Sequence, residues 1–333
     1  MAETLPSRFN NLWRLPSALV QYLTSIAASN PPADQLILDR SKPCLYRIDT
    51  ETSATITLRD GRKLGYAEYG SPHGRVIFCL HGLPGARTEA AMWDQIAVDV
   101  GARLISVDRP GIGWSSPQPG RRLLDHAKDI EQLAEHLRLD EYAVMGSSAG
   151  GPYALGCAYA LPADRLKAVA LVVGLGSPEM HGWKNYLGWC ACKYVPSLPK
   201  WFFSRDAAAR LDLSDEERYS IISRAPEARK TPEILRLFVQ RTSREIFAQG
   251  AQGLVDDAKT LGEDWGFRVE DIRKDLPVQL WYGKRDLVAP VAHGELYAAR
   301  LGGNATLRVE DENHGSMIQN WEREIQKALL AVM

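Results

Sequence analysis

The chain has 333 residues, of which 45% are hydrophobic and 24% are charged, as is ordinary for a globular protein with a sizeable core. Its length fits one large core with an inserted segment better than a single minimal domain. The formal net charge of −1 gives no electrostatic reason to expect nucleic acid or an anionic membrane as a partner.

The five cysteines are scattered at positions 44, 79, 157, 190 and 192. An odd number argues against a disulfide framework, and Cys190 and Cys192 lack the second pair that a zinc site needs. We therefore expect reduced thiols, no metal and a cytoplasmic protein.

The first 50 residues are predicted as a helical extension of the core. They lack the basic and apolar regions of a signal peptide. Their most hydrophobic stretch, Leu12 to Ala28, is too interrupted by polar residues for a membrane span. A helix packed on the body is the simplest interpretation, and a substrate-entrance flap or an interfacial anchor is the alternative.

From about residue 54, short apolar runs alternate with segments of helical periodicity. Thr55–Arg59 and Leu64–Tyr69 flank an Asp-Gly turn, which is typical of a β-hairpin. Arg122–Leu139 and the segment from Ile318 to Val332 repeat apolar residues along one helix face. This alternation predicts an α/β fold with a doubly wound, mostly parallel sheet. Six further apolar runs are the predicted strands: Arg75–Leu80, Leu104–Val107, Tyr142–Met145, Ala168–Val173, Val278–Tyr282 and Ala305–Val309.

The alternation stops between residues 177 and 270, where helix signals are present without a strong strand. Ser214 to Glu217 form a capping box, and Thr231 precedes a proline that can open a helix. We predict an all-helical cap at 177–270, inserted between two parts of the core at 51–176 and 271–333. Trp183 and Tyr186 belong to an aromatic cluster that serves either substrate binding or the core of the cap.

Residues 146–150 read Gly-Ser-Ser-Ala-Gly and match the pattern G-x-S-x-G. The pattern is common by chance, but here it follows a predicted strand and precedes Pro152–Leu161, a predicted helix of small residues. A sharp strand–turn–helix needs glycines beside the serine and holds the hydroxyl at the edge of the sheet. We therefore predict Ser148 as a nucleophile, rather than Ser147 at an x position.

A serine hydroxyl becomes a good nucleophile only when a neighbouring base accepts its proton. Of the seven histidines, His314 lies after the last predicted strand, in a loop at the sheet edge where Ser148 is expected. His126 and His136 are expected to face the solvent, and His293 to lie early in a helix. His314 is therefore the predicted base.

The orienting acid is predicted from the same argument. Asp286 follows the strand Val278–Tyr282, again at its carboxyl end. The chain order Ser, Asp, His is the order expected for this arrangement, in which Asp286 fixes the tautomer of His314. The rival acids are Asp256, Asp257 and Glu179.

The strand Arg75–Leu80 runs into a loop that reads His-Gly-Leu-Pro-Gly at residues 81–85. Such a loop supplies one backbone N–H to an oxyanion hole, and the residue after the nucleophile supplies the other. We therefore predict Leu83 and Ala149 as the two donors. His81 is a candidate for substrate binding, although a role in holding the loop by hydrogen bonds is favoured.

Over about residues 52–333 the sequence resembles the α/β-hydrolase superfamily, in the branch with a serine nucleophile and a helical cap. The residues that carry the resemblance are the 81–85 loop, the run Asp108–Ser115, the turn around Ser148, and Asp286 with His314. Residues 253–267 also resemble the end of the helical cap in one hydrolase subgroup. The resemblance implies an eight-stranded core, a structural role for Asp108 and acyl transfer without a cofactor. Epoxide hydrolases and haloalkane dehalogenases have an aspartate where this chain has Ser148.

The predicted function is hydrolysis of an ester, lactone or thioester bond in a mainly apolar small molecule, with water as co-substrate. One alternative is a cofactor-free C–C bond hydrolase, lyase or cyclase that uses the same triad. Another, of a different class, is a small-molecule receptor with a hydrolase-like pocket. The intact triad favours catalysis. No nucleic-acid partner and no membrane span are expected, and neither the physiological substrate nor the oligomeric state is predicted.

Overall fold

The computed structural model describes residues 44–180, 183–223 and 232–333, except for the side chains of residues 183–187 and 189. Residues 1–43 lie outside the described part, so the helix expected in the N-terminal extension stays a prediction. All five cysteine thiols are free. None of the helices in the described ranges combines the length and the apolar composition that crossing a membrane requires.

The core is one eight-stranded sheet with the order β1-β2-β4-β3-β5-β6-β7-β8. β1 pairs with β2 and β2 with β4 in antiparallel fashion, and all other pairs are parallel. The predicted doubly wound, mostly parallel sheet is therefore confirmed. The strands are β1 (Ser53–Thr57), β2 (Lys63–Gly70), β3 (Arg75–Leu80), β4 (Ala102–Val107), β5 (Tyr142–Ser147), β6 (Leu166–Val172), β7 (Val278–Gly283) and β8 (Ala305–Glu310).

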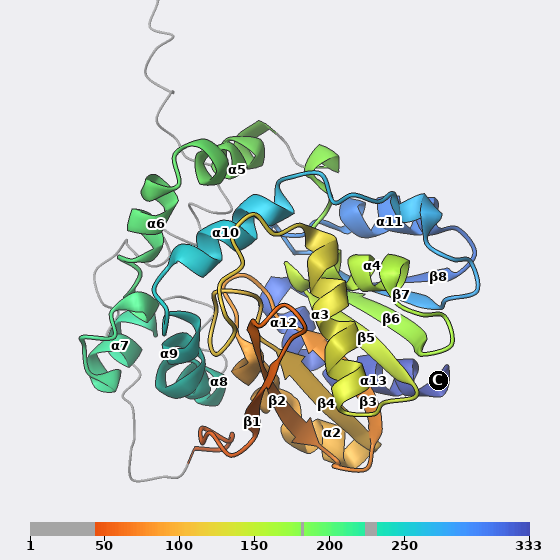
Figure 1. The fold of residues 1–333 in the computed structure, drawn as a ribbon, viewed down its shortest axis with the longest axis horizontal. Coiled ribbons are helices and arrows are strands. Elements are labelled where there is room, and N and C mark those ends of the chain that lie inside the picture. Colours follow the sequence, from red (N-terminus) through yellow and green to blue (C-terminus); the bar gives the residue numbers. More distant parts are fainter. Residues whose placement is uncertain (1–43, 181–182, 224–231) are drawn as a thin grey trace, which may run out of the picture.

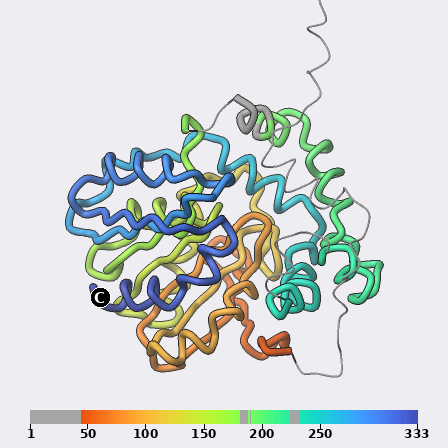
Figure 2. Tube along the Cα trace, turned by 180° about the vertical axis from the view of Figure 1, so that it is seen from behind, coloured from red at the N-terminus to blue at the C-terminus, as the bar shows by residue number. Residues whose placement is uncertain are grey.

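Helices cover both faces of the sheet. Helices α3 (Leu123–His136) and α4 (Gly150–Ala160) pack together and stand in front of the strands in Figure 1, while α2 (Asp94–Val100) packs on α13 (Glu322–Ala331). Figure 2, seen from behind, brings the C-terminal α13 to the front. Cover on both faces explains why the parallel strands read as continuous apolar runs.

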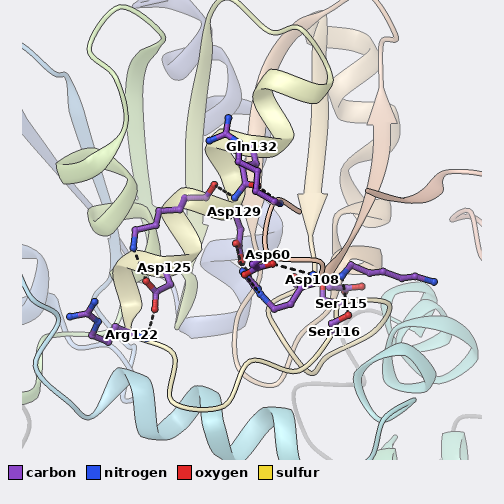
Figure 3. Close-up of polar contacts among 12 residues, drawn as sticks. Asp60, Asp108, Ser115, Ser116, Arg122, Asp125, Asp129 and Gln132 are labelled. Carbon is purple, nitrogen blue, oxygen red and sulfur yellow. Dashed lines mark hydrogen bonds and ion pairs between the residues drawn. The ribbon is translucent and has the colours of Figure 1, made fainter. Parts of the chain in front are cut away.

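Polar contacts tie the first hairpin to α3 and to the loop after β4 (Figure 3). Arg62 in the hairpin turn forms ion pairs with Asp60 at 2.7 Å and with Asp129 of α3 at 2.7 Å. The Ser115 hydroxyl accepts the N–H of Gly65 at 3.0 Å and donates to the carbonyl of Asp108 at 2.8 Å. These contacts fix the loop after β4 against β2.

The prediction that His126 faces the solvent is wrong, whereas His136 is exposed as expected. His126 is 3% exposed and packs edge-on against Tyr153 of α4. It lies between Leu123 and Ile130 on the helix face that packs on the core, so the helical period itself places it inside.

Strand order decides where the loops meet. β3 lies between β4 and β5, so the direction in which the sheet grows reverses there, and ligands bind at such points beyond the carboxyl ends of the strands. Leu80 at the end of β3 is in register with Gly146 in β5. Gly283 in β7 is in register with Glu310 in β8. Leu83, Ser148, Asp286 and His314, which follow β3, β5, β7 and β8, therefore lie at the same edge of the sheet.

The residues described between β6 and β7 form helices and no strand. We call residues 177–270 the insert. Figure 1 shows most of its helices on one side of the sheet, with α10 between the core and the helices α5 and α6. The predicted capping box is present, because the Ser214 N–H donates to the Glu217 carboxylate at 2.8 Å. The helices are α5 (Trp183–Tyr194), α6 (Ser197–Phe203), α7 (Asp215–Ile222), α8 (Pro232–Leu237), α9 (Ser243–Ile246) and α10 (Gln252–Leu261).

The C-terminal segment departs from the prediction in two ways. It forms two helices, α12 (His314–Asn320) and α13, rather than one, with a break at Trp321 (φ −110°, ψ 4°). His314 is the first residue of α12 and not part of a loop. The reason is a reciprocal cap, in which the Asn313 side chain accepts the Ser316 N–H and the Ser316 hydroxyl accepts the Asn313 N–H, each at 2.9 Å.

Candidate active site

Ser148 occupies a sharp turn between β5 and α4. Its backbone φ of 53° lies in the left-handed region, which a residue other than glycine adopts only under constraint from its surroundings. A Cβ at position 150 would lie 2.0 Å from the Leu80 carbonyl oxygen, and one at position 146 would lie 2.2 Å from the Gly150 carbonyl oxygen. The turn can therefore form only with glycine at both flanking positions, as the sequence predicts.

Ser148, His314 and Asp286 form one chain of hydrogen bonds. The Ser148 Oγ lies 2.9 Å from His314 Nε2, and His314 Nδ1 lies 2.7 Å from Asp286 Oδ2. The other carboxylate oxygen, Oδ1, accepts the backbone N–H groups of Val288 at 2.7 Å and Ala289 at 2.9 Å. Both oxygens of Asp286 are thus held, and the neutral imidazole tautomer that accepts the serine proton is the one this arrangement stabilises.

The three rival acids lie elsewhere. Glu179 pairs with Arg300 at 2.7 Å, and Asp256 accepts a hydrogen bond from Gln252 at 2.9 Å. Asp257 is fully buried in a cluster of arginines. Within the described part of the chain, Asp286 is the acid that contacts His314.

The loop after β3 lies directly against Ser148. A Cβ on Gly82 would lie 3.5 Å from the Ser148 Cβ and 3.9 Å from its Oγ. Leu83 follows Gly82, and Ala149 is fully buried at the start of α4. The 81–85 loop and the start of α4 thus both lie beside Ser148, as an oxyanion hole with two backbone donors requires. The assignment of the Leu83 and Ala149 N–H groups as these donors stays a prediction.

His81 is 3% exposed, and both of its ring nitrogens have partners in the protein. Its Nδ1 lies 2.8 Å from the Gly82 carbonyl oxygen, and its Nε2 lies 3.3 Å from the backbone N of Arg109. Burial and the Arg109 charge lower the pKa of His81 well below its ordinary value, so the ring is neutral. Because the Arg109 N–H can only donate, Nε2 accepts and Nδ1–H donates to Gly82.

Two carboxyl groups near this loop, the half-buried Glu89 and the buried Glu322, were not predicted from the sequence. Burial raises the pKa of Glu89 to about 7, although Arg109 and the Gly82 N–H lower it. Burial raises the pKa of Glu322, which is 1% exposed, to about 8, and the charge of Glu89 adds to that rise. The available signal for Glu322 was its place on the apolar face of α13, beside Ile325.

The insert packs over the loop that carries Leu83. The Leu83 side chain contacts two apolar clusters whose members include Leu254, Val255 and Ala258 of α10. The side chains of Trp183 and Tyr186, predicted to bind substrate, lie outside the described residues. A groove of about 550 Å³ is lined by parts of 177–179 and 262–270 together with Arg300, and the Ser148, Asp286 and His314 side chains do not line it.

A family model described as "alpha/beta hydrolase fold" matches residues 75–320. The chain belongs to the α/β-hydrolase family. The match contains the 81–85 loop, Ser148, Asp286 and His314. In the described ranges, no group of three or more His, Cys, Asp or Glu side chains is placed to hold a metal ion.

Two curated proteins are similar to this chain in sequence, and one solved structure is similar to it in fold. A non-heme haloperoxidase from Rhodococcus erythropolis is 26% identical over 260 residues, covering 76% of this chain and 89% of that protein. A proline iminopeptidase from Arabidopsis thaliana is 30% identical over 135 residues, covering 39% of this chain and 35% of its own length. The enol-lactonase structure from Burkholderia xenovorans LB400 superposes with a TM-score of 0.62 at 19% identity, covering 84% and 100% of the two chains.

Proposed function

We propose that this hydrolase cleaves an ester, lactone or thioester bond of a mainly apolar small molecule through an acyl-enzyme on Ser148. The observation that carries the proposal is the hydrogen-bonded chain from Ser148 through His314 to Asp286, at 2.9 and 2.7 Å. Both distances lie within the range in which a base takes a proton from a nucleophile.

In the proposed reaction the Ser148 Oγ attacks the substrate carbonyl while His314 Nε2 takes its proton. The carbonyl oxygen becomes an oxyanion, which the N–H groups of Leu83 and Ala149 stabilise. His314 then gives the proton to the leaving oxygen or sulfur, and the acyl-enzyme forms. A water molecule, activated by His314, releases the acid and restores Ser148, while Asp286 stabilises the imidazolium in both halves.

The substrate class rests on the surroundings of the site and on the relatives. Apolar residues of α10 lie over Leu83, which favours an apolar acyl or alcohol group beside the reacting carbonyl. The printed names of the relatives include an enol-lactonase, which supports cleavage of a cyclic ester. A cytoplasmic location belongs to the same proposal and rests on the sequence alone.

A panel of p-nitrophenyl esters of rising acyl length tests this function. We expect saturable hydrolysis that is lost in Ser148→Ala and kept in Ser147→Ala, which removes the hydroxyl of the neighbouring, buried serine. Equal hydrolysis by wild type and Ser148→Ala would refute the acyl-enzyme. No hydrolysis of any ester or lactone by folded wild type would favour C–C bond hydrolysis, lyase or cyclase chemistry, or a receptor that binds without turnover.

A further inference from the structure

A buried ionic cluster joins the insert to the core next to the site. Its centre is Asp257 of α10, which is fully buried and pairs with Arg109 at 2.7 Å and with Arg121 at 2.8 Å. The Tyr153 hydroxyl of α4 donates to the same carboxylate at 2.6 Å. Burial alone would raise the pKa of Asp257, but Arg109 and Arg121 lower it to about 2, so the carboxylate is charged at neutral pH.

Arg109 uses its remaining donors on the loop beside Ser148. Its Nη1 donates to the His81 carbonyl at 2.5 Å, and its Nη2 donates to the Gly82 carbonyl at 2.6 Å. The Gly82 carbonyl also accepts the Nδ1–H of His81 at 2.8 Å. Two donors on one carbonyl oxygen leave that peptide group little freedom to rotate.

The orientation of this peptide decides where the next N–H points. The Gly82–Leu83 peptide bond is trans. In a trans peptide the C=O and N–H groups point in opposite directions. Because Arg109 and His81 hold the Gly82 carbonyl on one side, the Leu83 N–H is directed to the other side, away from the cluster.

We infer that Arg109, held in place by Asp257 of the insert, is a positioning residue that aims the Leu83 N–H at the oxyanion formed on Ser148. This inference rests on the proposed function for its catalytic consequence. Since Asp257 belongs to α10, the position in which that helix packs on the core also determines the geometry of the oxyanion hole. A shift of α10 would free Arg109 and relax the loop, so the position of the insert affects turnover.

The first test measures the loop itself and needs no substrate. In Arg109→Lys a single ammonium cannot serve both carbonyls and Asp257, and in Asp257→Asn the countercharge is lost. We expect backbone hydrogen exchange in a peptide containing residues 81–86 to become about tenfold faster in both variants. Glu245→Gln is the matched control, because Glu245 pairs with Arg87 in a second buried insert–core contact that does not touch the loop. Unchanged exchange in both cluster variants, or equal acceleration in the control, would overturn the inference.

The second test measures the oxyanion hole through an ester and its thionoester. Sulfur is a weak hydrogen-bond acceptor, so a well-aligned hole favours the ester over the thionoester. We expect kcat on the ester to fall about 10- to 100-fold in Asp257→Asn with little change in KM, and the ester preference to fall with it. Tyr153→Phe, which removes one donor to Asp257, gives a milder variant should the others fold poorly. An unchanged ester preference in folded Asp257→Asn and Tyr153→Phe would contradict the positioning role. An inactive wild type would instead remove the proposed function, and the exchange result would still decide whether the cluster holds the loop.

Discussion

The two sides of Ser148 are built differently. On the side of His314, the acid follows β7, the base is the first residue of α12 after β8, and backbone N–H groups hold Asp286. On the side of Leu83, the loop is held by Arg109, and Arg109 is held by Asp257 of the insert. In the proposed mechanism, proton transfer therefore depends on residues of the core alone, whereas oxyanion stabilisation depends on the core and the insert together.

The largest effects are expected on the side that the core builds alone. Ser148→Ala and His314→Ala should each lower kcat by about 10⁴- to 10⁶-fold and to a similar extent, because the two residues act as one unit. Steady-state kinetics on the best p-nitrophenyl ester measures this, with the melting temperature showing that both variants fold. A loss of less than about tenfold in His314→Ala would contradict its role as the base.

Asp286→Asn should have the next largest effect, a loss of about 10³- to 10⁴-fold in kcat. The asparagine oxygen can still accept the N–H groups of Val288 and Ala289, which turns its NH₂ group toward His314 Nδ1. The imidazole must then carry its proton on Nε2 and cannot accept the Ser148 proton. Asp256→Asn, at a half-buried position of α10 where the carboxylate accepts a hydrogen bond from Gln252, is the control and should keep full activity. Equal kcat in Asp286→Asn and wild type would show that another acid orients His314.

A second buried ionic contact joins the insert to the core without involving Arg109 or Asp257. Arg87 pairs there with Asp108 at 2.7 Å and with Glu245 of α9 at 2.8 Å. Glu245→Gln should lower the free energy of unfolding by about 1–3 kcal/mol, because a buried charged hydrogen bond is weakened while Asp108 still serves Arg87. Its kcat should stay within about twofold of wild type, since oxyanion geometry is untouched. Urea unfolding measures the expected loss of stability, and steady-state kinetics measures the expected constancy of kcat. A large loss of kcat would mean that any loosening of the insert slows turnover.

The smallest effect concerns stability on the core side of the site. Burial raises the pKa of Glu322 from 4.5 to about 8, so the folded protein keeps its proton where the unfolded chain releases it. Stability is therefore lost as pH rises from about 4.5 to about 8. Glu322→Gln removes this loss, so its melting temperature should exceed that of wild type by a few degrees at pH 8.5 and nearly match it at pH 5. A gain that is equal at both pH values would show that Glu322 does not titrate in this window.

The sequence predicts those parts of the site that have a local pattern. The apolar run Arg75–Leu80 predicts β3 with the bounds observed. The glycines on either side of Ser148 predict the turn, because only glycine fits at those positions. Asp286 and His314 were predicted because each follows an apolar strand, and the structure brings the two side chains together. The exact start of α12 at His314 was missed, although the Asn313 and Ser316 cap was its signal.

The ionic cluster around Asp257, next to the 81–85 loop, has no comparable local pattern in the sequence. Arg109 and Asp257 are separated by 148 positions in the sequence and meet only once the insert has packed on the core. The sequence indicates Asp257 only as a rival acid, and Arg109 only as part of the run Asp108–Ser115 that carries the family resemblance. Burial of charged groups is decided by such distant partners, so hydropathy and spacing alone do not predict it.

The central claim is that Ser148 is a covalent nucleophile, and labelling with a fluorophosphonate probe tests it most directly. Intact-protein and peptide mass measurements should show one adduct per chain, on the peptide that contains Ser148, in wild type and Ser147→Ala. The adduct should be absent in Ser148→Ala and form slowly in His314→Ala. Folded wild-type protein that stays unlabelled, or that carries the adduct on another residue, would contradict the account.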